Sequence, residues 1–212
     1  MIYLNGKTEK DYNANYIHWE CTAPEPKLDP VEVPMRDGLI YCNEMLSSRI
    51  FFKARTITAK MELRGLRGEW PIVYSQILQD LHGKEVEVER SEDPGWIWTG
   101  HAVVGPLEEH GASAGVTITI TAQPFKQTKE WQLEEAIVLS GDEDITIDVP
   151  FMRGYPEFTA STSGMTVTYE DETWSLPSGS STANGLILFD GENELTLHGS
   201  GTMTVRYKGG QL

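Results

Sequence analysis

The chain has 212 residues, 39% of them hydrophobic, which is enough for one large or two small domains with a buried core. Its net charge of -15 argues against binding the nucleic-acid backbone as a main task, because such proteins carry a basic face. No apolar run approaches the roughly 18 residues that span a bilayer, and residues 1–7 are too polar for a signal peptide. Two cysteines, Cys21 and Cys42, make no disulfide framework, and we expect a protein made in a cytoplasm.

Proline interrupts the first part of the chain. Four prolines between residues 24 and 34 disfavour helix, and residues 31–33 alternate apolar and charged side chains like an edge strand. A longer strand is expected over residues 52–63. Its apolar residues are available for one side or for a bulged pair of sides: Ala54, Ile57, Ala59, Met61 and Leu63.

Residues 71–82 are the one convincing helix. Ile72, Val73, Ile77, Leu78 and Leu81 follow helical spacing, with Pro71 in the first turn and Gly83 as the C-cap. Strands are then predicted over 84–90 and 96–104, joined by a turn over 91–95. An unbroken alternation of β-branched residues predicts a strand over 116–121. The first segment is therefore expected to be a β-sandwich with one packed helix.

Charge is distributed unevenly along the chain. Residues 1–137 hold 14 basic and 21 acidic side chains, whereas residues 138–212 hold 3 and 11. This shift predicts two domains, 1–137 and 138–212. In the second, short strands are expected between turns, which favours a small sandwich or jelly roll: 145–149, 158–161, 165–169, 186–189, 194–198 and 202–207.

Residues that carry chemistry are few. Acid/base catalysis could use Glu108, Glu109 and His110, but we favour the interpretation that they form a solvated loop. Acids at 142–144 and 190–194 suit calcium less well than charged turns, because neither follows a known calcium-loop register. His18 and Cys21 are half of a zinc-like pair without a second half. We expect no enzyme, no metal and no cofactor; a glycosidase would need two opposed carboxylates that the sequence does not pair.

Three aromatic residues of the second segment are candidates for stacking on sugar rings, namely Tyr155, Tyr169 and Trp174. Tyr169 and Trp174 flank the polar turn 170–172 of an expected hairpin. The competing interpretation is that they belong to the core or to an interface, since Trp and Tyr bury well with a polar tip.

In their order along the chain, several motifs resemble those of the distal tail protein (Dit) of siphophages and prophages of Gram-positive bacteria. Residues 24–34 resemble its proline-rich arm, and residues 33–38 resemble its V-P-G-R-D-G motif, with Met35 where a Gly is usual. Residues 123–126 resemble a D-P-F-K strand end, and 191–196 a G-x-N-x-L-T turn. The remaining matches are a helix end and a hairpin, carried by Leu81, His82, Gly83, Pro94, Gly95, Trp96, Trp98 and Gly100.

The resemblance implies a structural hub in the virion tail tip or baseplate. Copies would form a ring, typically of six, that joins the tail tube to the tail-associated lysin or tail-tip protein and lets DNA pass. It implies a tail-tube-like N-terminal sandwich and a galectin-like or carbohydrate-binding-module-like C-terminal sandwich that carries receptor-binding proteins. Ring-interface candidates are Val33, Arg36, Asp37 and Gly38. The alternative is a carbohydrate-binding module that attaches to host glycan through the C-terminal sandwich.

Met35 is the main departure from the resemblance. A Gly at this position takes a positive φ angle, which Met disfavours, so we expect the local backbone to differ from that of the family.

Overall fold

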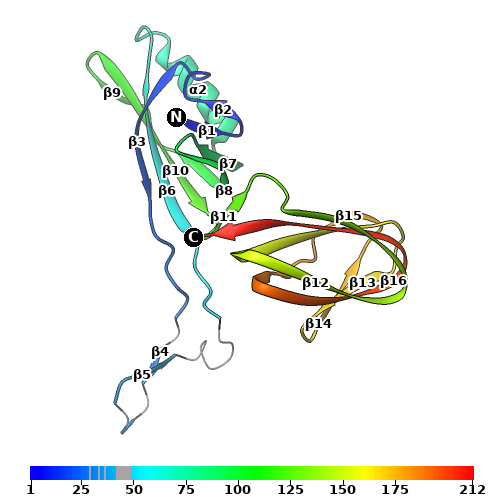
Figure 1. Cartoon of the computed structure of the whole chain (residues 1–212). Coiled ribbons are helices and arrows are strands. Elements are labelled where there is room, and N and C mark those ends of the chain that lie inside the picture. Colours follow the sequence, from blue (N-terminus) through cyan, green and yellow to red (C-terminus); the bar gives the residue numbers. More distant parts are fainter. Residues whose placement is uncertain (29, 33, 36, 42–48) are drawn as a thin grey trace. The chain divides into compact units, whose positions relative to one another are not determined.

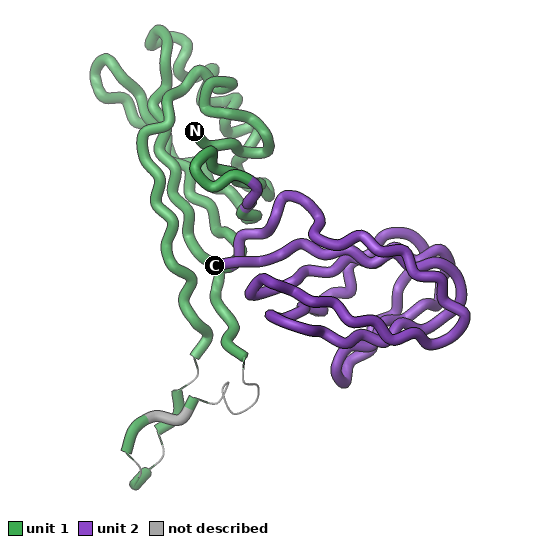
Figure 2. Tube along the Cα trace, in the orientation of Figure 1, with its two compact units in different colours: residues 1–94, 98–124 green, residues 95–97, 125–212 purple. Residues whose placement is uncertain are grey.

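The structure, a computed structural model, describes residues 1–28, 30–32, 34–35, 37–41 and 49–212, and is mainly β (Figure 1). It divides into two compact units (Figure 2). Unit 1 comprises Met1–Pro94 and Trp98–Pro124, and unit 2 comprises Gly95–Ile97 and Phe125–Leu212. The division after Pro124 differs from the one expected after residue 137, which lies inside a strand of unit 2.

The main sheet of unit 1 is antiparallel, in the order β8-β10-β6-β3. Its strands are β3 (Ala14–Cys21), β6 (Arg55–Leu63), β8 (Asp93–Val104) and β10 (Ser113–Ala122), and β9 (Glu108–His110) pairs with the start of β10. A second group of strands consists of β1 (Ile2–Leu4), β2 (Lys7–Thr8) and β7 (Glu85–Arg90). β1 pairs with β2 on one side and with β7 on the other, and β7 also pairs with β8 of the main sheet.

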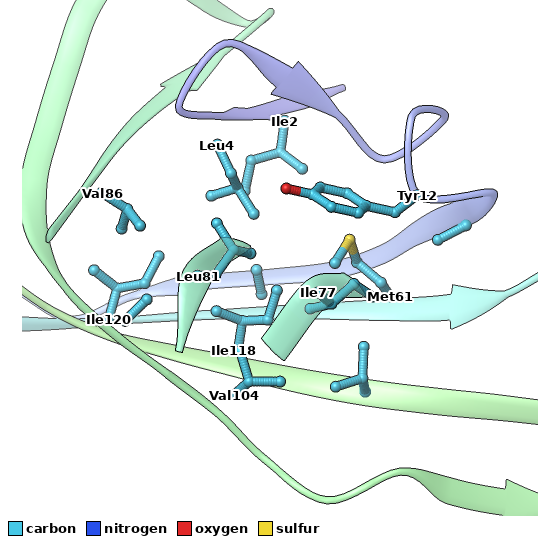
Figure 3. Close-up of a cluster of buried hydrophobic side chains, with 14 of the residues drawn as sticks. Ile2, Leu4, Tyr12, Met61, Ile77, Leu81, Val86, Val104, Ile118 and Ile120 are labelled. Atoms are coloured by element: carbon cyan, nitrogen blue, oxygen red, sulfur yellow. The ribbon is translucent and has the colours of Figure 1, made fainter. Parts of the chain in front are cut away.

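Helix α2 (Trp70–Leu81) confirms the helix predicted over 71–82, with Pro71 in its first turn. Trp70, Ile77 and Leu81 are its buried residues, and they join one apolar cluster with β1, β6 and β10 (Figure 3). Alternate residues of β6 point inward, namely Ile57, Ala59, Met61 and Leu63. No helix in the described part of the chain is long and apolar enough to cross a membrane.

The hairpin after α2 is tighter than predicted. Only Ser91 and Glu92 form the turn, and Asp93 and Pro94 already belong to β8. The predicted turn over 91–95 is therefore too long, because antiparallel strands need no more than two connecting residues. The strands predicted over 84–90 and 116–121 are confirmed within β7 and β10.

Unit 2 is a β-sandwich built on two long bent strands, β12 (Leu133–Ala160) and β16 (Leu188–Gln211). β12 pairs with β16 twice, so Val205 lies opposite both Glu135 and Phe158. Gly141 faces Gly199 in this ladder, and both have positive φ, which marks a bend that other residues resist. The short strands predicted in this segment are therefore largely pieces of β12 and β16.

The remaining strands of unit 2 complete its two edges. β13 pairs with β14 and β16, β15 pairs with β12, and β11 pairs with β16. Their bounds are β11 (Lys126–Thr128), β13 (Met165–Tyr169), β14 (Glu172–Leu176) and β15 (Gly179–Ser181). The enclosed core contains Phe158, Met165, Leu188, Leu195, Leu197, Met203 and Val205.

Candidate functional site

Residues 23–54 are hereafter called the arm, and those next to Thr22 and Thr56 continue the pairing of β3 with β6 beyond the main sheet (Figure 1). Thr22 and Thr56 are joined through backbone and hydroxyl groups, at 3.0–3.2 Å. Farther out, Lys53 N donates to Glu25 O at 2.8 Å, and Lys27 N donates to Phe51 O at 2.7 Å. The hairpin β4 (Pro30–Glu32) and β5 (Leu39–Tyr41) confirms the short strand expected near Val31.

The arm exposes apolar side chains that a packed hairpin would bury. Leu28, Val31, Met35, Ile50 and Phe51 are 39% to 108% exposed. The ion pair between Lys53 and Glu25, at 3.1 Å, is exposed and contributes little stability. A two-stranded ribbon without a covered apolar face is only marginally stable in water. A partner surface that covered these side chains would therefore stabilise the arm.

The turn between β4 and β5 holds the ring-interface candidates. Val33 and Arg36 lie outside the described residues, whereas Asp37 and Gly38 are exposed and Gly38 has φ 83°. Met35 has φ 67°, the left-handed conformation that Gly favours, contrary to the expected change of backbone. For a non-glycine residue this conformation costs roughly 1–2 kcal/mol. Met35 therefore combines a left-handed backbone with a fully exposed side chain.

The helix-end motif fastens α2 to β8. Leu81 is 1% exposed, and the backbone N of Gly83, at φ 72°, donates to Ala102 O at 2.8 Å. The imidazole of His82 accepts a hydrogen bond from the backbone N of Val104 at Nδ1, 3.1 Å away. Leu, His and Gly in this order therefore provide a buried anchor, a side-chain acceptor and a left-handed C-cap.

Gly100 and the two tryptophans of the hairpin motif each have a packing role. A Cβ on Gly100 would lie 2.4 Å from the carbonyl oxygen of Thr121, so only Gly fits between β8 and β10. Trp98 packs against Trp19 in unit 1, with ring centroids 5.9 Å apart. Trp96 meets Phe151 edge-to-face in unit 2, at 5.8 Å. Pro94 lies in β8, and Gly95 adopts φ 86°. These motif residues are structural.

Tyr169 is a core residue, so its expected role in sugar stacking is wrong. Its hydroxyl donates to Asn193 Oδ1 at 2.8 Å, in buried surroundings. Asn193 Oδ1 also accepts from Phe189 N at 2.9 Å, and its Nδ2 donates to the carbonyls of Ile147, Phe189 and Gly191 at 2.8–3.3 Å. Asn193 therefore stabilises the start of β16, where the sequence predicted a turn from the G-x-N-x-L-T motif and the structure has continuous strand. Trp174, the second candidate, is half-buried and donates from Nε1 to Asn184 O at 3.0 Å.

Tyr155, the third stacking candidate, lines a pocket of about 520 Å³ within unit 2. The other main side chains of this Trp131 pocket come from distant parts of the chain, namely Gln127, Trp131, Glu157, Asn184 and Lys208. The guanidinium carbon of Arg206 lies 4.2 Å from the centroid of the Trp131 ring, and Lys208 Nζ lies 5.3 Å from it. The sequence-based reasoning missed Trp131, because β12 and β16 bring its partners together only in the fold.

Tyr155 is positioned by a glycine. A Cβ on Gly210 would lie 2.7 Å from Tyr155 Cε2, so the ring occupies space that a side chain would fill. Burial raises the pKa of Tyr155 to about 12, although Arg153 opposes the shift. The phenol therefore stays protonated near neutral pH and can donate a hydrogen bond.

Glu157 is paired on one side only. Its Oε1 accepts from Ser180 Oγ at 2.5 Å and from Arg206 Nε at 3.1 Å and NH2 at 2.5 Å. Burial alone would raise its pKa, but the hydrogen bonds from Ser180 and Arg206 lower it below the usual value. All three bonds end on Oε1. Oε2 has no hydrogen-bond partner in the part of the chain that the structure describes.

A chain of polar side chains joins the strands on another part of unit 2. Asp142 Oδ1 lies 2.9 Å from His198 Nδ1, His198 Nε2 lies 3.1 Å from Thr168 Oγ1, and Thr168 lies 2.9 Å from Thr173. The order acid, imidazole, hydroxyl is that of a nucleophilic triad. Here, however, the hydroxyl is shared with Thr173, and none of the four residues lines the Trp131 pocket. The arrangement cross-links strands.

The acidic groups that were considered for catalysis or calcium lie mainly in strands. Residues 108–110 form β9 instead of a loop, and Glu109 pairs with Arg67 at 2.6 Å. Asp144 accepts a hydrogen bond from Thr196 Oγ1 at 2.7 Å, from within β12 instead of a turn. Among the described residues, His, Cys, Asp and Glu nowhere gather in a group of three that could hold a metal.

Neither a known family model nor a curated protein sequence matches this chain. Among solved structures, the fold is similar to the crystal structure of the SPP1 Dit (gp 19.1) protein. The match has a TM-score of 0.61 at 13% sequence identity and covers 100% of this chain and 98% of that one. That protein is described as a paradigm of the hub adsorption apparatus in phages that infect Gram-positive bacteria. The similarity establishes a fold shared over the full length.

Proposed function

We propose that this protein is a structural hub of a siphophage tail tip, and that copies of it form a ring between the tail tube and the tail-tip and receptor-binding proteins. The observation that carries the proposal is the similarity to a phage hub protein over both chains nearly end to end. A match confined to one sandwich would reflect a common fold used for many tasks. A match across two units and the arm favours a shared architecture and a structural role over an enzymatic one.

The arm supports assembly with a second copy. Its apolar side chains Leu28, Val31, Met35, Ile50 and Phe51 remain 39% to 108% exposed. Apolar side chains gathered on an extended element are typical of a protein–protein interface. Each copy would lay its arm on the body of the next, a head-to-tail contact that closes into a ring when the rotation permits.

β3 offers a second contact for assembly. It is the last strand of the order β8-β10-β6-β3, and in the described residues it pairs with β6 alone. Such an open edge can accept a strand from another chain. The register shift between Tyr16 and His18 leaves Ile17 59% exposed on this strand. An interface along β3 would bury that side chain.

The net charge of -15 supports a channel through which DNA passes without adhering. An acidic wall repels the phosphate backbone, whereas a basic wall would bind it and release counterions. In this function the protein is part of the virion, assembled from copies made in the host cytoplasm. Its partners would be the tail-tube protein, the tail-associated lysin or tail-tip protein, and a receptor-binding protein.

Electron microscopy of the purified full chain tests this function. The hub proposal predicts ring-shaped particles with a central opening and six-fold symmetry. As a control, a variant with the arm replaced by a short turn between Thr22 and Thr56 should give no rings. Compact particles of irregular symmetry, or rings that persist without the arm, would contradict the proposed assembly.

A further inference from the structure

The Trp131 pocket concentrates the few cations of an acidic segment. After residue 137 the chain has 3 basic side chains against 11 acidic ones, and two of the three, Arg206 and Lys208, lie over the Trp131 ring. Arg206 is neutralised by Glu157, at 2.5 Å. Lys208 forms no salt bridge among the residues that the structure describes, although its charge contributes to lowering the pKa of Glu157. Together, Arg206, Lys208 and Glu157 therefore leave one net positive charge beside the Trp131 ring.

The pocket also combines flat aromatic surface with unused hydrogen-bonding groups. Trp131 and Tyr155 supply ring faces, whose negative potential attracts the polarised C–H groups of a sugar ring. Glu157 Oε2 can accept a hydrogen bond from a ligand hydroxyl, and the amides of Gln127 and Asn184 line the same space. A volume of about 520 Å³ falls in the range of roughly 300–1,000 Å³ that small-molecule sites occupy.

We propose that the Trp131 pocket binds a residue of an acidic saccharide, whose carboxylate or phosphate pairs with Lys208 while its ring packs on Trp131 and Tyr155. A hydroxyl of the sugar donates to Glu157 Oε2. This site goes beyond the hub function and does not depend on it, because every group that forms the site belongs to unit 2.

The charge of the pocket selects an acidic sugar over a neutral one. A neutral sugar would leave the net positive charge of the pocket unbalanced, because the single carboxylate of Glu157 faces two cations. The overall charge of -15 repels acidic ligands in general, so an acid can be held only where a local cation offsets that field. Lys208 is placed to do so.

Nuclear magnetic resonance of the full chain tests the site through the indole N–H signal of Trp131, assigned with a Trp131→Phe variant. Sodium glucuronate, glucose 6-phosphate, glucose and inorganic phosphate are titrated separately. We expect the two acidic sugars to shift this signal with a Kd on the order of 1 mM. Glucose should bind about fivefold more weakly or less, and phosphate alone should not reproduce the shift.

Each ligand distinguishes a part of the proposal. If no sugar shifts the Trp131 signal, the site is overturned. Equal binding of glucose and glucuronate would overturn the assignment to an acidic sugar. If phosphate alone matched glucose 6-phosphate, the site would be an anion site and not a saccharide site. Stronger binding of glucuronate than of glucose 6-phosphate identifies a carboxylate as the preferred acid, and the reverse order identifies a phosphate.

Variants separate the contributions of charge and stacking. Lys208→Gln should lower glucuronate affinity to that of glucose and leave glucose binding unchanged. Lys126→Gln is the matched control, because Lys126 also lies over an indole, 5.0 Å from the Trp96 ring centroid, but outside the pocket. Gly210→Ala should weaken all sugars by displacing the Tyr155 ring. Unchanged glucuronate binding in Lys208→Gln would overturn the proposal.

Discussion

The two units cover their cores by different means and leave different surfaces exposed. Unit 1 closes one face of its sheet with α2 and places exposed apolar side chains on the arm. Unit 2 folds two long strands over themselves and surrounds a pocket with aromatic and cationic groups. This contrast teaches that the arm suits association with a protein surface, whereas the pocket suits a small polar ligand. Changes in one unit should therefore leave the task of the other intact.

Replacing the arm is expected to have the largest effect. Thr22 and Thr56 are already hydrogen-bonded, so Gly-Asn in place of residues 23–54, with Arg55 retained, would close the β3–β6 hairpin by a short loop. We expect the variant to fold with a free energy of unfolding within about 1 kcal/mol of the parent, and to be monomeric. Sizing chromatography with light scattering measures the mass. A variant that still assembles would place the interface elsewhere.

Asn193→Leu should damage unit 2 without changing assembly. It removes the acceptor of Tyr169 and leaves several backbone groups unpaired, which should cost about 3 kcal/mol or more in urea unfolding. The exposed Asp190→Ala in the same part of β16 is the control and should cost less than about 0.5 kcal/mol. Equal stabilities of the two variants would mean that the hydrogen bonds of Asn193 do not stabilise this part of β16.

Gly100→Ala tests the packing of unit 1. The added methyl group meets the Thr121 carbonyl at 2.4 Å and should destabilise the protein by about 2 kcal/mol. Gly68→Ala is the matched control, because a Cβ there meets nothing within 4 Å. It should be neutral or stabilising by up to about 1 kcal/mol. Thermal unfolding of both variants measures the difference, and similar melting temperatures would refute the close approach of β8 and β10.

Met35→Glu probes the arm by a single side chain. Met35 is fully exposed, so stability should change by less than about 0.5 kcal/mol, whereas association should weaken about tenfold if a neighbouring copy covers it. Leu66→Glu, also in unit 1 and 75% exposed but outside the arm, is the control and should assemble normally. Sedimentation velocity over a dilution series compares them, and equal weakening would show no special role for the arm.

The smallest expected effect is on acid stability. Glu157 has a lowered pKa in the folded state, so the stability it contributes is present above its unfolded value, near 4.5, and is lost as the pH falls through the folded pKa. Glu157→Gln should therefore lose less stability than the parent below pH 4.5. The exposed Glu143→Gln serves as the control. Parallel stability curves for the parent and Glu157→Gln between neutral and acidic pH would contradict the pairing with Arg206.

Local patterns in the sequence predicted the elements that local patterns determine. The spacing of apolar residues located α2, and the alternation of β-branched residues located β10. The mainly β class followed from these elements and from the motifs of the resemblance. The arm followed from its prolines, but the positive φ of Met35 did not, because the preference against that conformation is weak enough to be overridden by its surroundings.

Features that depend on pairing between distant parts of the chain could not be predicted from local sequence patterns. The sequence predicted several short strands where the structure has the long strands β12 and β16. Gly141, Gly199 and Gly201 suggested turns, but in the structure they bend continuous strands. The charge shift placed the division of the chain after residue 137, whereas the structure divides it after Pro124. Residue 137 lies inside β12, so the change in charge falls within one strand of unit 2. Trp131 had no local signal, since its partners Arg206 and Lys208 reach it through the pairing of the long strands. Asn193 was visible only as part of a motif.

The central claim is that copies of this chain assemble through the arm. The most direct test is the mass of the full chain in solution, measured by light scattering behind a sizing column over a range of protein concentrations. The hub proposal predicts a closed particle of six times the sequence mass of 23.7 kDa, and a monomer once the arm is replaced. A single monomeric species at every concentration, with the arm present, would contradict it.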